Sequence, residues 1–306
     1  MSFSCVKEKL TLAFDIEGTL LDKKGILQPE VYEIFKKADL SNTNFVFLTG
    51  GSYSIAVETV KQINDIIDGE FMPWIVSNGG SQIYAPSGNL IFDSSLDNEV
   101  ITDVVKTAKE IDSGAVFMYA TTDTNYVEVQ QKTFNKIAMD LYKRKDAKKG
   151  CSAMNLVDVE GVATGRSLED VLSEIGEVKE LYAVSLSGSK REKLLSALEN
   201  ILAGRNSVYG GKYMAIPARN KLSALQYLVS SESSMPKDVT DVVYFGDGLN
   251  DVECLQACSV SVARGEQACK EAKEVAKFRV NDLSHFADAL YAGEYKTLKS
   301  EEILTK

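Results

Sequence analysis

The chain has 306 residues, of which 44% are hydrophobic, and it carries a formal net charge of -10. This length predicts about two domains, and the composition is sufficient for well-packed cores. The acidic charge argues against binding nucleic acid through a broad basic face, and no apolar run approaches the roughly 18 residues of a membrane span. Charged residues stand where a signal peptide needs its apolar stretch. We therefore expect a cytoplasmic protein that binds neither nucleic acid nor membranes.

The cysteines and the histidine narrow the possible chemistry. The five cysteines are odd in number and include no Cys-x-x-Cys pair, so neither a zinc site nor a disulfide framework is predicted. The single histidine, His285, has no neighbour in sequence that would activate it, and we interpret it as structural. Catalysis at neutral pH must then depend on carboxylates, lysine, hydroxyl groups and metal.

Three short apolar runs near the N-terminus predict buried strands, at residues 11–14, 45–48 and 74–77. Helical periodicity lies between them, at 30–40 and 52–67. Strands that alternate with helices and are apolar on both faces predict a parallel sheet covered by helices on both sides. Ligands bind at the carboxyl ends of the strands in such sheets.

The pattern changes near Tyr84. A hairpin comes first, and helices and short strands then follow in mixed order, including a helix at 130–144. This mixture predicts an α+β domain inserted into the parallel one. We predict a core made of residues 1–84 and 213–306, with the α+β domain of residues 85–212 between its two parts.

Polar side chains follow the ends of three predicted strands. Asp15 follows the first strand, Thr49 follows the second, and Asp247 follows a later apolar run at 242–245. Because the carboxyl ends of parallel strands lie at one edge of a sheet, these side chains can converge. Asp247 and Asp251 could hold Mg²⁺, which prefers oxygen ligands. Taken alone, the same turn could be an acidic surface loop with a helix N-cap.

Four segments in chain order together resemble the motifs of the haloacid dehalogenase superfamily of phosphohydrolases. These segments are Asp15-Ile16-Glu17-Gly18-Thr19, then Thr49, then Lys221 after the helix cap Asn220, and finally Gly246 through Asp251. The long insertion resembles the α+β cap, called C2B, of the Cof-like branch. The resemblance covers almost the whole chain. It implies a three-layer, Rossmann-like α/β core with a parallel sheet and an inserted α+β cap domain.

The resemblance also implies a mechanism. Asp15 would attack the substrate phosphorus to form an aspartyl-phosphate, and Glu17 would protonate the leaving alcohol and then activate water. Mg²⁺ would be held by Asp15, Asp247, the main-chain carbonyl of Glu17 and, through water, Asp251. The phosphoryl oxygens would be bound by the amides of Ile16 and Gly50 and by the side chains of Thr49, Lys221 and Asn250.

Two positions depart from the pattern of the family. Glu17 stands where the family usually has Asp; the free pKa is similar, but the carboxyl group lies about one carbon–carbon bond further out. A start of Asp-x-Glu-Gly-Thr also resembles the enolase-phosphatase branch, which works with Glu. Gly51 stands where Cof-like relatives often carry Arg, so one positive contact near the entrance would be missing.

These features predict a Mg²⁺-dependent phosphatase, a phosphoric monoester hydrolase, that acts on a small phosphorylated metabolite such as a sugar phosphate. Two alternatives remain open. A hexose phosphomutase would use a similar core and cap, and a non-catalytic protein that binds a phosphorylated ligand would keep the fold. Neither the physiological substrate nor the oligomeric state follows from the sequence.

Overall fold

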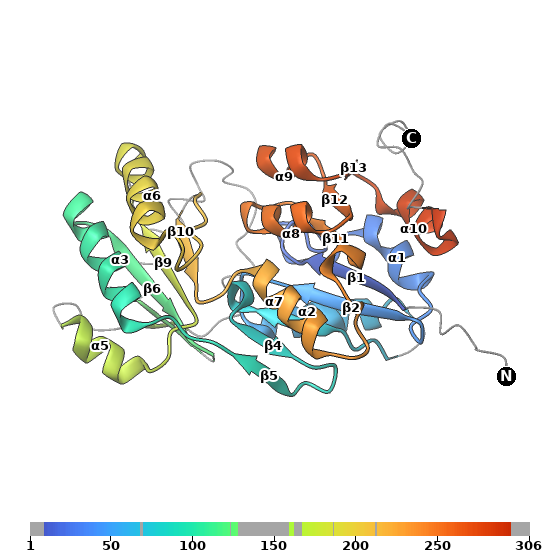
Figure 1. Ribbon diagram of the computed structural model, residues 1–306, viewed down its shortest axis with the longest axis horizontal. Helices are drawn as coiled ribbons and strands as arrows, with labels where there is room; N and C mark the ends of the chain where they lie inside the picture. The colour runs from blue at the N-terminus through green and yellow to red at the C-terminus, as the bar shows by residue number, and fades with distance from the viewer. Residues whose placement is uncertain are drawn as a thin grey trace.

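The computed structural model describes residues 9–67, 70–122, 124–127, 159–161, 167–185, 187–211 and 213–294. Within these residues the strands form one eight-stranded and one five-stranded sheet. Figure 1 shows the smaller sheet and its helices at the left and the larger sheet at the right. We call the part built on the larger sheet the core and the part built on the smaller sheet the cap.

The core sheet is parallel except at one edge. Its strand order is β13-β12-β11-β1-β2-β3-β4-β5. The pairs from β13 to β3 are parallel, whereas β3, β4 and β5 pair antiparallel. The strands are Leu10–Asp15 (β1), Thr43–Leu48 (β2), Trp74–Ser77 (β3), Gln82–Tyr84 (β4), Leu90–Asp93 (β5), Val243–Gly246 (β11), Val260–Arg264 (β12) and Phe278–Val280 (β13).

Helices cover both faces of this sheet because alternate strand residues point to opposite sides. Phe14 of β1 packs with α1, α2 and α10, whereas Ala13 packs with α7, α8 and α9. This three-layer arrangement confirms the predicted fold class. The helices are Tyr32–Lys36 (α1, after a 3-10 turn at Pro29–Val31), Tyr53–Asn64 (α2), Lys221–Ser231 (α7), Val252–Ala257 (α8), Lys270–Val275 (α9) and Leu283–Ala292 (α10).

The cap sheet has the order β10-β9-β6-β7-β8, and all its pairs are antiparallel except β7 with β8. Its strands are Val116–Ala120 (β6), Asn125–Val127 (β7), Val159–Gly161 (β8), Glu180–Val184 (β9) and Met214–Pro217 (β10). The helices that pack on it are Asn98–Ile111 (α3), Leu168–Ile175 (α5) and Gly188–Leu202 (α6). No helix in the described part of either domain is long and apolar enough to cross a bilayer.

The predicted domain limits do not follow the sheets. Strand β5 pairs with β4 in the core sheet, although residues from 85 onward were assigned to the insertion, and β10 pairs with β9 in the cap. The sequence of a hairpin does not reveal which sheet it extends, so the domain limits stay a prediction. We propose instead that the cap comprises residues 94–217. The predicted helix at 130–144 lies outside the described residues.

A buried lysine fixes the cap to the core where the chain first passes between them. Lys179 is 1% exposed, and its ammonium pairs with Asp93, at the end of β5, and with Glu177, both at 2.7 Å. The Ser81 hydroxyl of the core donates to the carbonyl oxygen of Lys179 at 2.7 Å. The strand that follows Lys179, β9, is thereby held close to the carboxyl ends of the core strands.

Candidate active site

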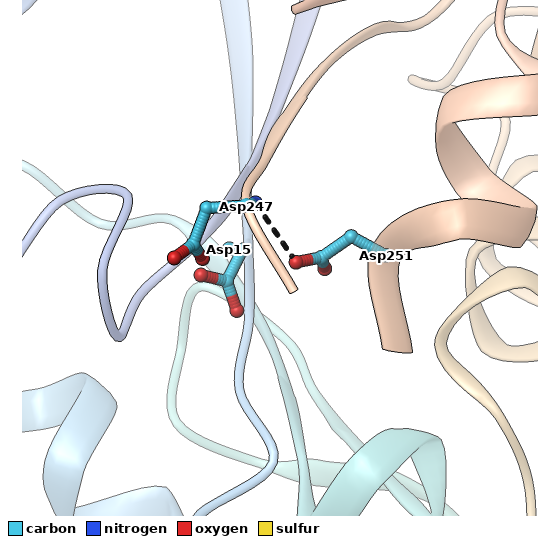
Figure 2. Close-up of side chains that lie close together, drawn as sticks. All are labelled: Asp15, Asp247 and Asp251. Carbon is cyan, nitrogen blue, oxygen red and sulfur yellow. Dashed lines mark hydrogen bonds between the residues drawn. The ribbon is translucent and has the colours of Figure 1, made fainter. Parts of the chain in front are cut away.

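The structure brings the predicted site residues together at the carboxyl ends of three neighbouring strands, β11, β1 and β2. Asp15 ends β1, Thr49 follows β2, and Asp247 follows β11. One carboxylate oxygen from each of Asp15, Asp247 and Asp251 lies within 4.8 Å of the others. Figure 2 shows these three side chains gathered at one place, with the Asp247 amide bonded to the Asp251 carboxylate.

Lys221 completes this cluster from the first turn of α7. The helix begins there because the Asn220 side chain accepts a hydrogen bond from the Ser223 amide at 2.8 Å, which caps it. The Lys221 ammonium is fully buried and donates to Asp15 Oδ1 and, at 2.8 Å, to Asp251 Oδ1. Burial alone would lower the pKa of Lys221, but the charges of Asp15 and Asp251 raise it overall. The lysine therefore stays positively charged.

The carboxyl groups fit a hard divalent cation. Asp15 Oδ2 is buried and has no hydrogen-bond partner among the described residues, which leaves it available as a ligand. The cluster offers carboxylate oxygens without histidine or cysteine, a donor set that suits Mg²⁺ better than zinc. Burial and then the charge of Asp251 raise the pKa of Asp15. A bound cation would offset this repulsion.

The other two carboxylates are positioned by groups that the sequence reasoning missed. Asp251 accepts hydrogen bonds from the Tyr244 hydroxyl at 2.7 Å and from the amides of Asp247 and Gly248 at 3.1 and 2.9 Å. The Thr19 hydroxyl donates to Asp247 at 3.4 Å. Burial, followed by the charge of Asp251, raises the pKa of Asp247 to about 7. A tyrosine inside an apolar strand was the available signal, because a buried hydroxyl needs a partner.

Glu17 lies near the acidic cluster of Asp15, Asp247 and Asp251. Its carboxyl group points toward Thr49, which follows β2. The Thr49 hydroxyl is 2.7 and 2.9 Å from the two carboxylate oxygens of Glu17, and the same hydroxyl accepts a hydrogen bond from the Gly51 amide at 2.8 Å. Burial raises the pKa of Glu17 even though the hydrogen bond from Thr49 opposes it. The Thr49 hydroxyl therefore holds the Glu17 carboxyl group in place, and the metal contact of Glu17 stays a prediction that involves its main-chain carbonyl.

One predicted phosphate ligand, the Ile16 amide, already has an acceptor within the protein, and its contact with phosphate stays a prediction. The Ile16 amide donates to the Leu48 carbonyl oxygen at 3.2 Å, because the parallel ladder between β1 and β2 continues one residue past the strand. Two of the other predicted phosphate ligands, Gly50 and Asn250, lie close to each other. A Cβ atom on Gly50 would lie 3.6 Å from Asn250 Nδ2, so the Asn250 amide lies over the loop that follows β2.

A sequence profile of the haloacid dehalogenase-like hydrolases matches residues 12–285 of the chain. The chain belongs to this family. The match confirms the resemblance carried by the four motifs, and with it the predicted class of enzyme, a hydrolase of the phosphatase type.

Several relatives of this haloacid dehalogenase-like hydrolase match most of its length. A 5-amino-6-(5-phospho-D-ribitylamino)uracil phosphatase of Escherichia coli is 23% identical over 269 residues, which cover 88% of this chain and 89% of the relative. A family hydrolase from B. subtilis has a TM-score of 0.73 at 17% identity and covers 92% of this chain and 98% of its own. The subclass IIB sugar phosphatase BT4131 has a TM-score of 0.67 at 16% identity, covering 94% of this chain and 100% of its own.

Gly18→Ala should weaken metal binding in this hydrolase. Gly18 has a φ of +95°, and a Cβ atom there would lie 2.3 Å from Asp247 Oδ2, so the carboxyl group would have to move. We expect Mg²⁺ affinity to fall by about 10–100-fold, as for other changes that displace a ligand. Titration of Mg²⁺ against melting temperature measures the affinity without activity.

Gly204→Ala is the matched control for this substitution. Gly204 also has a positive φ, +76°, but nothing lies within 4 Å of the added Cβ atom. Both variants should lose roughly 1–3 kcal/mol of stability through backbone strain. Only Gly18→Ala should lose Mg²⁺ affinity, and equal affinities in the two variants would show that Asp247 does not bind the metal.

Proposed function

We propose that this hydrolase is a Mg²⁺-dependent phosphatase of small phosphorylated metabolites that works through an aspartyl-phosphate on Asp15. The observation that carries the proposal is the placement of this carboxylate. Asp15 is buried at a strand end, one of its oxygens contacts the Lys221 ammonium, and the other has no hydrogen-bond partner among the described residues. A carboxylate held in this way is oriented for catalysis, and we assign one of its oxygens to the metal and the other to the attack on phosphorus.

Positive charge is needed because an anionic nucleophile attacks an anionic phosphate. Among the described residues, Lys221 is the ammonium that contacts the acidic cluster, where it meets Asp15 and Asp251. Asp15, Asp247 and Asp251 would hold Mg²⁺ together with the main-chain carbonyl of Glu17. The bound ion supplies further positive charge for the phosphoryl oxygens. Thr49 and Asn250, on either side of Gly50, would orient the same oxygens.

Glu17 supplies the proton in this proposal. Its buried carboxyl group has a raised pKa, so a larger fraction of it is protonated near neutral pH, as a general acid requires. The Thr49 hydroxyl fixes its position. After the alcohol leaves, the ionised Glu17 can take a proton from the water that attacks the aspartyl-phosphate.

The names of two relatives support the proposed substrate class. One is a sugar phosphatase and the other is a 5-amino-6-(5-phospho-D-ribitylamino)uracil phosphatase. Both names support a small phosphorylated metabolite as the substrate. Location in the cytoplasm and the absence of nucleic-acid partners stay predictions.

Phosphate release from 4-nitrophenyl phosphate and from a panel of phosphorylated metabolites tests the proposal. We expect Mg²⁺-dependent release of inorganic phosphate from both. A non-catalytic ligand-binding protein would release none. A phosphomutase would instead convert a hexose 1-phosphate to its 6-phosphate when a hexose bisphosphate is added, without releasing phosphate, and product analysis separates these outcomes.

Removal of the metal should abolish activity. A bound cation typically contributes several kcal/mol to such chemistry, so excess chelator should lower turnover by about 10²-fold or more. Added Mg²⁺ should restore turnover and should also raise the melting temperature, because the ion binds only the folded cluster. Full activity in chelator, with no metal detected in the protein, would contradict the proposal.

A further inference from the structure

Two polar side chains of the cap strand β9 reach the loop that follows β2 in the core. The Tyr182 hydroxyl donates to the Gly50 carbonyl oxygen at 3.0 Å and lies 2.6 Å from Glu180 Oε2. Gly50 directly follows Thr49, whose hydroxyl contacts Glu17. A continuous set of contacts therefore joins the cap pair to the carboxyl group that we propose as the general acid.

The sheet geometry turns this pair away from the cap interior. Leu181 and Ala183 of β9 pack into the hydrophobic cluster under α3, α5 and α6. Since successive strand residues point to opposite faces, Glu180 and Tyr182 lie on the face without these helices. Beside them in the sheet are apolar residues that are at most 9% exposed, namely Met118, Ala120 and Ala215.

The core approaches Glu180 closely. Gly79 has a φ of +69°, and a Cβ atom there would lie 3.3 Å from Glu180 Oε1 and 2.7 Å from a Pro217 side-chain atom. The Gly79 amide donates to the Thr49 carbonyl oxygen at 3.1 Å. The carboxyl group of Glu180 thus lies over the loops that follow β2 and β3, at the edge of the sheet where the phosphoryl group would bind.

Burying a carboxyl group is costly unless it is compensated. Glu180 is 2% exposed, and burial raises its pKa to about 8, although the hydrogen bond with Tyr182 and the charge of Lys221 oppose this; Glu17 adds a smaller upward effect. At neutral pH the group is therefore mostly protonated and can donate a hydrogen bond. Tyr182 has a single hydroxyl hydrogen and two nearby acceptors, Gly50 and Glu180. If the protonated Glu180 carboxyl group donates its hydrogen to the Tyr182 oxygen, the Tyr182 hydroxyl hydrogen can bond to the Gly50 carbonyl oxygen.

We propose that Glu180 and Tyr182 recognise the leaving group and select an uncharged, hydroxylated alcohol such as a sugar or a polyol. The inference rests on the proposed phosphatase function. A carboxyl–phenol pair can exchange hydrogen bonds with hydroxyl groups of the substrate. A second phosphate or a carboxylate on the leaving group would meet an acidic side chain and apolar neighbours, with no cation at Gly51, so such substrates would be disfavoured.

Tyr182→Phe and Glu180→Leu, which each remove the hydrogen-bonding group, test this proposal with two substrates. 4-Nitrophenyl phosphate has no hydroxyl groups on its leaving group, whereas ribitol 5-phosphate has several. We expect each variant to lower kcat/KM for ribitol 5-phosphate by about 10–100-fold, mainly through KM. The kcat/KM for 4-nitrophenyl phosphate should change by less than about threefold, because this leaving group has no hydroxyl that could bond to Glu180 or Tyr182.

Tyr209→Phe is the control for an effect on cap docking alone. The Tyr209 hydroxyl also joins the cap to the core, since it donates to Glu253 of α8 at 2.8 Å, but it takes no part in the proposed site. Removing it should affect both substrates equally. If Tyr182→Phe lowers kcat/KM equally for ribitol 5-phosphate and 4-nitrophenyl phosphate, Glu180 and Tyr182 only dock the cap on the core, and the proposal is overturned.

The wild-type protein separates failure of this inference from failure of the proposed function. The leaving-group assignment alone would be refuted if the protein releases phosphate from 4-nitrophenyl phosphate in a Mg²⁺-dependent way but prefers phosphoglycolate or fructose 1,6-bisphosphate to ribitol 5-phosphate. No release from any of these esters would refute the phosphatase function, and the assignment with it. Thermal melting of each variant checks that the fold is intact.

Discussion

Asp15→Asn should abolish phosphate release while the protein remains folded. An amide is nearly isosteric with a carboxylate but is a poor nucleophile and a weaker metal ligand. We expect turnover of 4-nitrophenyl phosphate to fall by at least about 10³-fold, since loss of a nucleophile in other enzymes costs up to about 10⁶ in kcat. No covalent phosphate should be trapped on the variant by acid quench. Turnover within tenfold of wild type would remove Asp15 from the nucleophile role.

The same variant should not be less stable than the wild type when metal is absent. Burial and neighbouring carboxylates raise the pKa of Asp15, so ionising this group opposes folding as the pH rises above its usual value. Asn removes that cost at neutral pH, although it also weakens the contact with Lys221. Asp251, at 2.8 Å, still neutralises the lysine.

Asp112→Asn serves as the control. It should lower stability without changing turnover, which is the reverse of the result expected for Asp15→Asn. A hydrogen bond from Ser185, at 2.6 Å, is the main cause of a lowered pKa at Asp112. A carboxyl group with a lowered pKa stabilises the fold above its unfolded pKa, and that stability is lost as the pH falls through the folded pKa. Asp112→Asn should therefore lower the melting temperature at neutral pH and leave turnover unchanged.

The strand ends explain why so much of the site could be predicted. Asp15, Thr49 and Asp247 each follow a short apolar run, and parallel strands bring such positions to one edge of a sheet. The order of the strands, β11-β1-β2, then makes them neighbours. The resemblance to the family motif identified Lys221, and the N-cap Asn220 before it fixes where the helix begins.

Contacts that depend on tertiary packing could not be predicted in this way. Glu180 and Tyr182 lie in strand β9, but alternation alone does not show which face of the cap sheet meets the core. The Tyr244 hydroxyl reaches Asp251 because the chain turns back after β11 into the 3-10 turn at Leu249–Asp251. The apolar strand pattern predicts only that Tyr244 is buried. The hydrogen bond from the Ile16 amide to the Leu48 carbonyl oxygen depends on the register between β1 and β2, which the sequence does not specify.

The structure also links the two departures from the family pattern. A Cβ atom on Gly51 would lie 3.2 Å from Glu17 Oε1 and 2.3 Å from Ile55 Cδ1. The longer carboxyl side chain of Glu17 therefore lies over a residue that has no side chain. An arginine at position 51 would require Ile55 to shift and would crowd this carboxyl group. Glu17 and Gly51 are compatible with each other in a way that neither position reveals alone.

Glu17→Gln should lower turnover by roughly 10²–10⁴, the usual contribution of general acid–base catalysis. The amide oxygen can still accept the hydrogen bond from Thr49, so the fold should persist. Covalent aspartyl-phosphate should accumulate wherever its hydrolysis is slowed more than its formation. Substrates with good leaving groups, such as 4-nitrophenyl phosphate, should show this most clearly because their first step needs the acid least. Acid quench with a radiolabelled phosphoryl group measures the intermediate.

Glu17→Asp is the sharper test, because it restores the residue usual in the family. Thr49 Oγ1 lies 2.7 and 2.9 Å from the two oxygens of Glu17, and a side chain shorter by about 1.5 Å would lose that contact. We therefore expect a reduced rate for a poor leaving group, with the Mg²⁺ affinity unchanged because the predicted metal contact is through the backbone. A rate equal to or above that of wild type would show that the site only tolerates Glu. An unchanged rate for Glu17→Gln with the same substrate would exclude Glu17 as the acid and require another proton donor.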